Sequence, residues 1–152
     1  MSKKLEIRIL SENTVEQRKL LAEHGLSFYF KYNEKEYLFD TGQGEVLFSN
    51  AEKMDIDLNN IDTVFLSHGH DDHTGGLKKL LDFKPEIEVF AHSDIFEPKY
   101  KKTDAGLEFI GTDLDKSDID NFTAAETTVA AAAGVYNTGE IPAPRDTYIN
   151  QR

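Results

Sequence analysis

Three of the five histidines in the chain lie within six residues, in the segment SHGHDDHTGG at positions 67–76. Imidazole nitrogens and carboxylate oxygens are the usual protein ligands of zinc and similar divalent ions. His68 and His70 are two positions apart, so in an extended backbone their side chains point the same way and can hold one ion. The first half of this segment therefore predicts a metal site.

The second half of the segment supplies further ligands. A tight turn at Asp71 aims Asp72 and His73 at a neighbouring point and leaves the carboxylate of Asp71 facing away. Gly75 and Gly76 let the backbone pass close to the metals before a helix begins. The candidate metal ligands are His68, His70, Asp72 and His73, and Asp72 is also the candidate catalytic residue.

A predicted strand and a predicted helix flank this segment. Residues 63–66 are all apolar or β-branched, which is typical of a strand buried on both faces, and residues 76–83 favour a short helix. Leu5, Ile7 and Ile9 alternate with charged residues, as in a half-buried strand. Other predicted strands lie at 26–32, 36–39 and 87–91, and another predicted helix lies at 45–54. Residues 15–22 carry only a short helical patch within a polar segment. The order β-β-β-α-β-α-β favours a mixed α/β layer fold.

The pattern weakens beyond His92. Residues 104–120 carry six acidic side chains against one lysine, which indicates a solvated region around a short strand at 107–110. Residues 127–133 fit a strand or a helix, and the Thr-Thr-Val start favours the strand. No internal repeat or linker is evident, so we expect a single domain over residues 1–152.

Composition excludes several classes of function. The chain has 152 residues, a formal net charge of −11 and no cysteine. Without cysteine there is no disulfide, thiolate zinc site or cysteine nucleophile. The acidic balance argues against a nucleic-acid or membrane partner, whose phosphates would be repelled. No apolar run approaches the roughly 18 residues of a membrane span, and the start lacks the apolar core of a signal peptide, so we expect a cytoplasmic protein.

Residues 63–77 resemble the metal-binding signature of the metallo-β-lactamase superfamily, and LFDTG at 38–42 resembles its preceding motif. The resemblance implies an αββα sandwich. A narrower resemblance is to one subfamily, the metal-dependent hydrolases of β-lactamase superfamily II. It is carried by residues 22–28, 39–43 and 138–142. Some members of that subfamily are identified as dihydropterin–aminobenzene-phosphate synthases.

The resemblance also implies roles for single residues. His68 and His70 would serve one metal, and Asp72 and His73 a second. Asp40, at the end of its strand, would hold the histidine loop by hydrogen bonds. The implied nucleophile is a hydroxide bridging two divalent ions, with zinc expected and iron or manganese as alternatives. Candidate pocket residues are His24, His92 and Glu140.

The ligand set of the superfamily is incomplete here. Its members are longer, and their second half supplies a further histidine for each metal and a bridging acid. This chain has no histidine after His92, and a catalytic zinc usually takes three protein ligands plus water. One interpretation is an N-terminal half, missing its C-terminal half, whose sheet exposes an apolar face that favours self-association. Alternatively Asp94, the acids at 104–120 or the second subunit of a homodimer supply the rest.

Three functions follow from these observations. The first is a metal-dependent hydrolase acting on a small-molecule ester, lactone, thioester or phosphoester. The second is a non-catalytic metal- or ligand-binding half-domain, and the third is a synthase acting on a phosphorylated pterin precursor. Ser67 lacks a nucleophile elbow, and Gly42-Gln43-Gly44 lacks the remaining glycine of a dinucleotide fingerprint.

Overall fold

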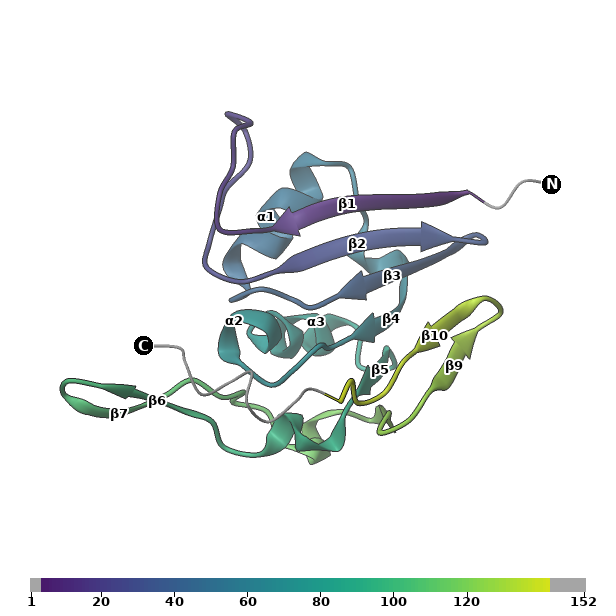
Figure 1. Cartoon of the computed structure of the whole chain (residues 1–152). Coiled ribbons are helices and arrows are strands. Elements are labelled where there is room, and N and C mark those ends of the chain that lie inside the picture. Colours follow the sequence, from purple (N-terminus) through teal and green to yellow (C-terminus); the bar gives the residue numbers. More distant parts are fainter. Residues whose placement is uncertain (1–3, 143–152) are drawn as a thin grey trace.

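The computed structural model describes residues 4–142, which are built around a six-stranded mixed sheet (Figure 1). Its strands, in spatial order, are β1 (Leu5–Ser11), β2 (Ser27–Tyr32), β3 (Lys35–Phe39), β4 (Ile61–Phe65), β5 (Glu88–Ala91) and β8 (Asn121–Ala124). The first three strands pair antiparallel, whereas β3, β4, β5 and β8 run parallel. The loops that follow β3, β4 and β5 therefore meet at one edge of the sheet, where open α/β sheets form their sites.

Two helices, α1 (Glu45–Lys53) and α3 (Leu77–Phe83), cover one face of the sheet (Figure 1). Leu47 of α1 and Leu80 of α3 are fully buried against Leu38 and Val64 of the sheet. Burying each leucine stabilises the fold by roughly 1.5–3 kcal/mol. A single helical turn, α2 (Asp71–Thr74), and the short 3-10 helices η1 (Leu58–Asn60), η2 (Ser93–Phe96) and η3 (Lys116–Asp118) lie in the connections.

The opposite face of the sheet is aromatic and only partly covered. Tyr37, Phe65 and Phe90 are buried there under the hairpin of β9 (Val129–Ala132) and β10 (Val135–Asn137). Leu5, Ile7 and Ile9 of β1 pair with Tyr32, Phe30 and Phe28 on this side and are 56–57% exposed. No layer formed by residues 4–142 covers that end of the face.

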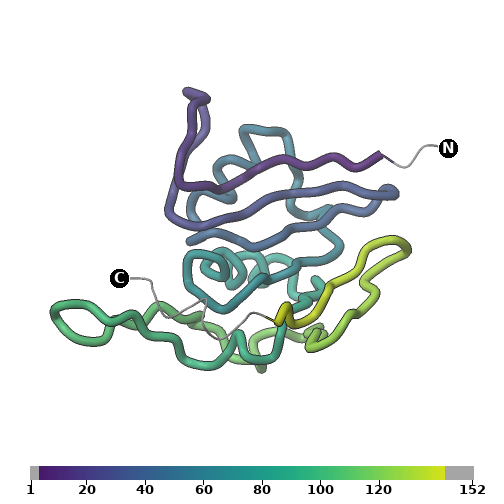
Figure 2. The backbone as a smooth tube through the Cα atoms, viewed as in Figure 1, coloured from purple at the N-terminus to yellow at the C-terminus, as the bar shows by residue number. Residues whose placement is uncertain are grey.

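A second hairpin, β6 (Tyr100–Thr103) and β7 (Gly106–Phe109), extends away from the body of the molecule (Figure 2). Its base contacts the loop after β4. The N–H of Asp71 donates to the carbonyl of Ile110, and the N–H of Ile110 donates to the carbonyl of Lys99. The hairpin is thus tied to the histidine segment by its backbone.

The predicted mixed α/β order is confirmed, with the single turn α2 added inside the histidine segment. The strand within 127–133 is present as β9. The helical patch at 15–22 is wrong, because these residues form turns and irregular chain. There the Asn50 side chain accepts a hydrogen bond from the N–H of Leu21 and donates one to the carbonyl of Leu21. Both backbone groups of Leu21 are thus hydrogen-bonded without a helix.

The burial expected for β1 also needs correction. The strand forms, but its apolar side is the exposed one, whereas Leu10, between Ile9 and Ser11, is 1% exposed on the helix-covered side. The alternation of apolar and charged residues therefore predicts the strand, but it does not predict which face of the strand the helices cover. Within residues 4–142 no helix is both long and apolar enough to cross a bilayer.

Candidate metal centre

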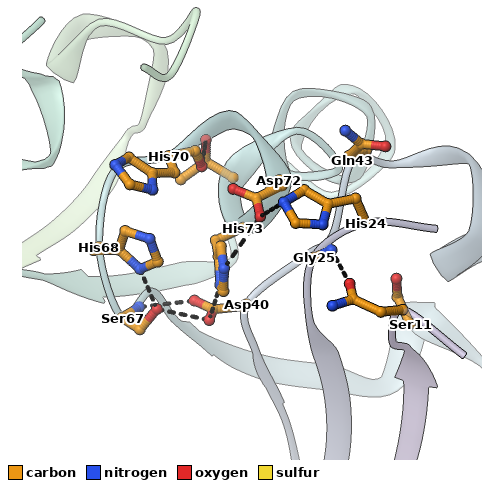
Figure 3. A network of polar contacts seen from close by, with 12 residues as sticks. Ser11, His24, Gly25, Asp40, Gln43, Ser67, His68, His70, Asp72 and His73 are labelled. Carbon is orange, nitrogen blue, oxygen red and sulfur yellow. Dashed lines mark hydrogen bonds and ion pairs between the residues drawn. The ribbon is translucent and has the colours of Figure 1, made fainter. Parts of the chain in front are cut away.

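Asp40 joins the loop after β3 to the loop after β4. Its side chain is fully buried, and its backbone has a left-handed φ of 56°. The carboxylate accepts hydrogen bonds from the N–H and the hydroxyl of Ser67, both at 2.7 Å, and lies 2.7 Å from Nδ1 of His73 (Figure 3). A buried carboxylate needs such partners to offset its lost hydration. The three contacts hold the start and the end of the histidine segment together.

These contacts assign the protonated nitrogens of two histidines. The hydroxyl of Ser67 donates to Asp40, so its oxygen is left to accept from Nδ1–H of His68 at 2.9 Å. Nδ1–H of His73 likewise donates to Asp40. With both Nδ1 atoms protonated, Nε2 of each neutral ring carries the lone pair that binds a metal.

His68, Asp72 and His73 offer one ligand atom each within 4.8 Å of one another, and no other such group of three exists among residues 4–142. Nε2 of His73 lies 3.5 Å from Oδ2 of Asp72. Two imidazoles and a carboxylate are a suitable donor set for zinc, iron or manganese. The ring of His70 lies beside this group, with its centroid 4.4 Å from that of His68.

The residues considered as substitute ligands do not join this group. Asp94 lies on η2 with its side chain 76% exposed and its Oδ2 3.7 Å from Nδ1 of His92. The acids at 104–120 are also outside the group, and the side chain of Asp71 is exposed. The reason is positional, because η2 and the β6–β7 region contact the histidine segment through backbone atoms rather than carboxylates.

Glycines let neighbouring backbone approach the histidine segment. A β-carbon on Gly69 would overlap the carbonyl oxygen of Ile95 in η2, and one on Gly76 would overlap that of Thr41. At Gly75 it would come within 2.6 Å of the carbonyl oxygen of Gln43. The close approach that Gly75 and Gly76 allow in this structure is to the loop after β3.

The half-buried histidines His68 and His73 have shifted pKa values. Burial, together with the charges of His73 and His70, lowers the pKa of His68. Burial also opposes protonation of His73, but the hydrogen bond and charge of Asp40 outweigh it, and Asp72 adds to them, so the pKa of His73 is raised. The neutral, ligand-competent form is thus favoured at His68.

A cavity of about 740 Å³ adjoins the group at His68. Phe30, Phe39 and Phe65 form its apolar side, and the other side comes from the β9–β10 hairpin and residues 137–141. His92 and Glu140 line this cavity. His24 does not line it and instead places Nε2 3.3 Å from Oδ2 of Asp72, because the β1–β2 loop reaches the histidine segment from another side.

Sequence reasoning missed two supporting residues, Glu23 and Thr41. The Glu23 carboxylate accepts from the N–H groups of Gln43 and Gly44, at the start of α1. The N–H and hydroxyl of Thr41 both donate to the carbonyl of His73, at 2.7 and 3.0 Å. Both lie in the motifs that carry the family resemblance, which was the available indication. The metal-binding roles themselves stay predictions.

The chain is similar to several known proteins. The family model of the metallo-β-lactamase superfamily matches residues 21–146. An uncharacterized protein of Methanocaldococcus jannaschii is 37% identical over 108 residues, covering 70% of this chain and 40% of the relative. The 7,8-dihydropterin-6-methyl-4-(β-D-ribofuranosyl)-aminobenzene-5'-phosphate synthase of the same organism is 30% identical over 132 residues, covering 79% of this chain and 45% of the relative. The chain thus spans less than half the length of these relatives.

Solved structures show the same fold. The crystal structure of Tm1679, a metal-dependent hydrolase of the β-lactamase superfamily, matches 88% of this chain and 47% of its own, with a TM-score of 0.65 and 23% identity. The subclass B3 metallo-β-lactamase BJP-1 of Bradyrhizobium japonicum matches 69% of this chain and 41% of its own, with a TM-score of 0.51 and 16% identity. The match over residues 21–146 establishes that this chain belongs to the metallo-β-lactamase superfamily.

Proposed function

We propose that the chain carries the metal-binding part of a hydrolase that acts on a small-molecule ester, lactone, thioester or phosphoester. The observation that supports this most directly is the grouping of ligand atoms from His68, Asp72 and His73 within 4.8 Å, next to a cavity of about 740 Å³. A bound divalent ion would lower the pKa of water and polarise the bond to be cleaved.

The chain's own residues would perform the remaining tasks. Asp40 accepts a hydrogen bond from Nδ1–H of His73 and another from the hydroxyl of Ser67, whose oxygen in turn accepts from Nδ1–H of His68. These hydrogen bonds fix the orientation of both rings. The apolar side of the cavity, at Phe39 and Phe65, would exclude water from the body of the substrate. His68 is the candidate ligand that lines this cavity, which would place the reacting group there.

Metal content is the first test of this proposal. Purified protein is dialysed exhaustively, and bound zinc, iron and manganese are measured per chain by elemental analysis. We expect retained metal in the unaltered chain and its loss in His68→Ala. A chain that retains none overturns the proposal.

Turnover is the second test. The metal-loaded protein is assayed against a chromogenic ester, a lactone, a thioester and a phosphodiester, with the His68→Ala variant as the blank. We expect metal-dependent hydrolysis of at least one of these. Retained metal without turnover supports the non-catalytic binding module instead.

A synthase is the second candidate function. It is supported by the 30% identity to the aminobenzene-phosphate synthase over 79% of this chain. Incubating the metal-loaded protein with a phosphorylated dihydropterin precursor and its aminobenzene partner tests it. Condensed product, detected by mass spectrometry, would favour the synthase over the hydrolase.

A further inference from the structure

His24 lies in the β1–β2 loop with the residues on both sides of it held in place. The carboxylate of Glu23 accepts from the N–H of Gln43 at 3.0 Å. Gly25 has a φ of 118°, and its α-carbon faces the carbonyl of Asp72 so closely that a β-carbon there would overlap the oxygen. The backbone therefore presents His24 at the edge of the candidate metal centre.

The ring of His24 approaches a candidate ligand atom directly. Its Nε2 lies 3.3 Å from Oδ2 of Asp72, the oxygen that is also 3.5 Å from Nε2 of His73 (Figure 3). Zinc bonds of about 2.0–2.1 Å hold tetrahedral ligand atoms roughly 3.3 Å apart. Both separations are thus those expected between ligands of one ion.

The position of His24 also offers a third protein ligand to the ion at Asp72 and His73. Figure 3 shows His24 on the opposite side of Asp72 from His68 and His70. If His68 serves a first ion together with His70, as the family resemblance implies, Asp72 and His73 alone would give a second ion only two protein ligands. A catalytic zinc usually has three and an open fourth position. His24 is outside the group that lies within 4.8 Å, so its ring must turn to face the ion, and a side chain 75% exposed has room to do so.

We propose that His24 is a protein ligand of the ion held by Asp72 and His73. The inference rests on the proposed metal centre. It gives one ion a complete set of two imidazoles and a carboxylate from residues of this chain, with no ligand borrowed from a second subunit. The ion favoured by that set is zinc or a similar divalent metal.

Zinc affinity and the ligand count test this proposal together. Zinc is titrated against a competing chelator with the unaltered chain and with His24→Ala, and the imidazoles per zinc are counted by X-ray absorption. Loss of an outer partner weakens zinc binding about 10–100-fold, so loss of a ligand should weaken one site by at least about 100-fold. The imidazole count should fall in the same variant. Circular dichroism of the metal-free chains checks that both are folded.

Two further variants separate a ligand from a mere neighbour. His92→Ala removes a ring that lines the cavity but lies outside the ligand group, and its zinc affinity should equal that of the unaltered chain. His24→Gln can still donate a hydrogen bond to Asp72 but is a poor zinc ligand, so it should behave as His24→Ala does.

The outcomes distinguish this inference from the proposal on which it rests. If His24→Gln keeps the affinity of the unaltered chain, or if the imidazole count does not change in His24→Ala, His24 only positions Asp72 and the inference is overturned. If the unaltered chain binds no zinc, the metal centre itself fails, and this inference fails with it.

Discussion

Gly25 and Asp72 meet backbone to backbone, with no room between them for a β-carbon on the glycine. The N–H of Leu26 donates to the same carbonyl oxygen of Asp72 at 3.4 Å. The β1–β2 loop therefore sets the position of the backbone that carries a candidate ligand, although Gly25 and Asp72 are 47 positions apart in the sequence.

Gly25→Ala should displace the turn that carries Asp72. The left-handed φ of 118° and the overlap with the carbonyl oxygen both oppose a side chain. We expect a loss of roughly 1–3 kcal/mol in the free energy of unfolding, together with weaker zinc binding. Gly106→Ala is the matched control, because Gly106 has a φ of 127° and nothing within 4 Å of the added carbon. Equal zinc affinity in the two variants, measured by chelator competition, would contradict this account.

Asp40→Asn should loosen the histidine loop. The carboxylate receives three hydrogen bonds from Ser67 and His73 through two accepting oxygens. An amide has one accepting oxygen and one NH2 group, so at least one of these donors loses its acceptor, at a cost of about 1–3 kcal/mol. Zinc affinity should fall roughly 10–100-fold. Asp55→Asn is the control, since Asp55 also has a left-handed φ, of 55°, but is exposed. Urea unfolding and zinc titration measure the two effects, and similar results for both variants would refute the role of Asp40.

Asp72→Ala and Asp71→Ala should differ sharply although the residues are adjacent. Asp72 belongs to the ligand group, whereas the side chain of Asp71 is exposed and its backbone N–H, which an alanine keeps, makes the contact to Ile110. We expect Asp72→Ala to lose dialysis-resistant metal and Asp71→Ala to retain most of it. Elemental analysis decides, and comparable losses would show that the turn is oriented differently.

Tyr37→Phe should leave the protein as stable as before or stabilise it by about 1 kcal/mol. The hydroxyl of Tyr37 is buried without a hydrogen-bond partner among residues 4–142, so its removal abolishes a desolvation cost. Tyr29→Phe is the comparison, because the hydroxyl of Tyr29 hydrogen-bonds Glu36 and its loss should destabilise. Urea unfolding midpoints measure both, and a marked loss of stability in Tyr37→Phe would reveal an unrecognised partner.

Stability should fall in alkaline solution. Burial, with the charge of Glu36, raises the pKa of Tyr29, and burial, with the charge of Asp62, raises that of Tyr37. A raised folded pKa contributes stability that is fully present below the ordinary tyrosine pKa of about 10 and is lost as the pH rises through the folded value. Thermal unfolding from pH 8 to 11 tests this, with Tyr37→Phe expected to lose less than the unaltered chain.

Local patterns in the sequence were sufficient to predict most of the sheet and the candidate ligands. The run at 63–66 and the spacing of His68, Asp72 and His73 are contained in a short stretch, so no distant contact was needed to interpret them. What failed depends on distant partners. The segment 15–22 has helical periodicity, but Asn50 binds its backbone instead. The position of His24 beside Asp72 depends on how a loop folds back across the sheet edge, which periodicity does not encode.

The polar contacts link His24, Asp72, His73, Asp40, Ser67 and His68 into one continuous chain. Residues that share partners in this way do not contribute independent energies, and the effect of one substitution depends on whether its neighbour is intact. Asp40 is the junction, since it contacts both Ser67 and His73. Double variants along this chain should therefore cost less than the sum of their single variants, and the centre behaves as one cooperative unit rather than as separate ligands.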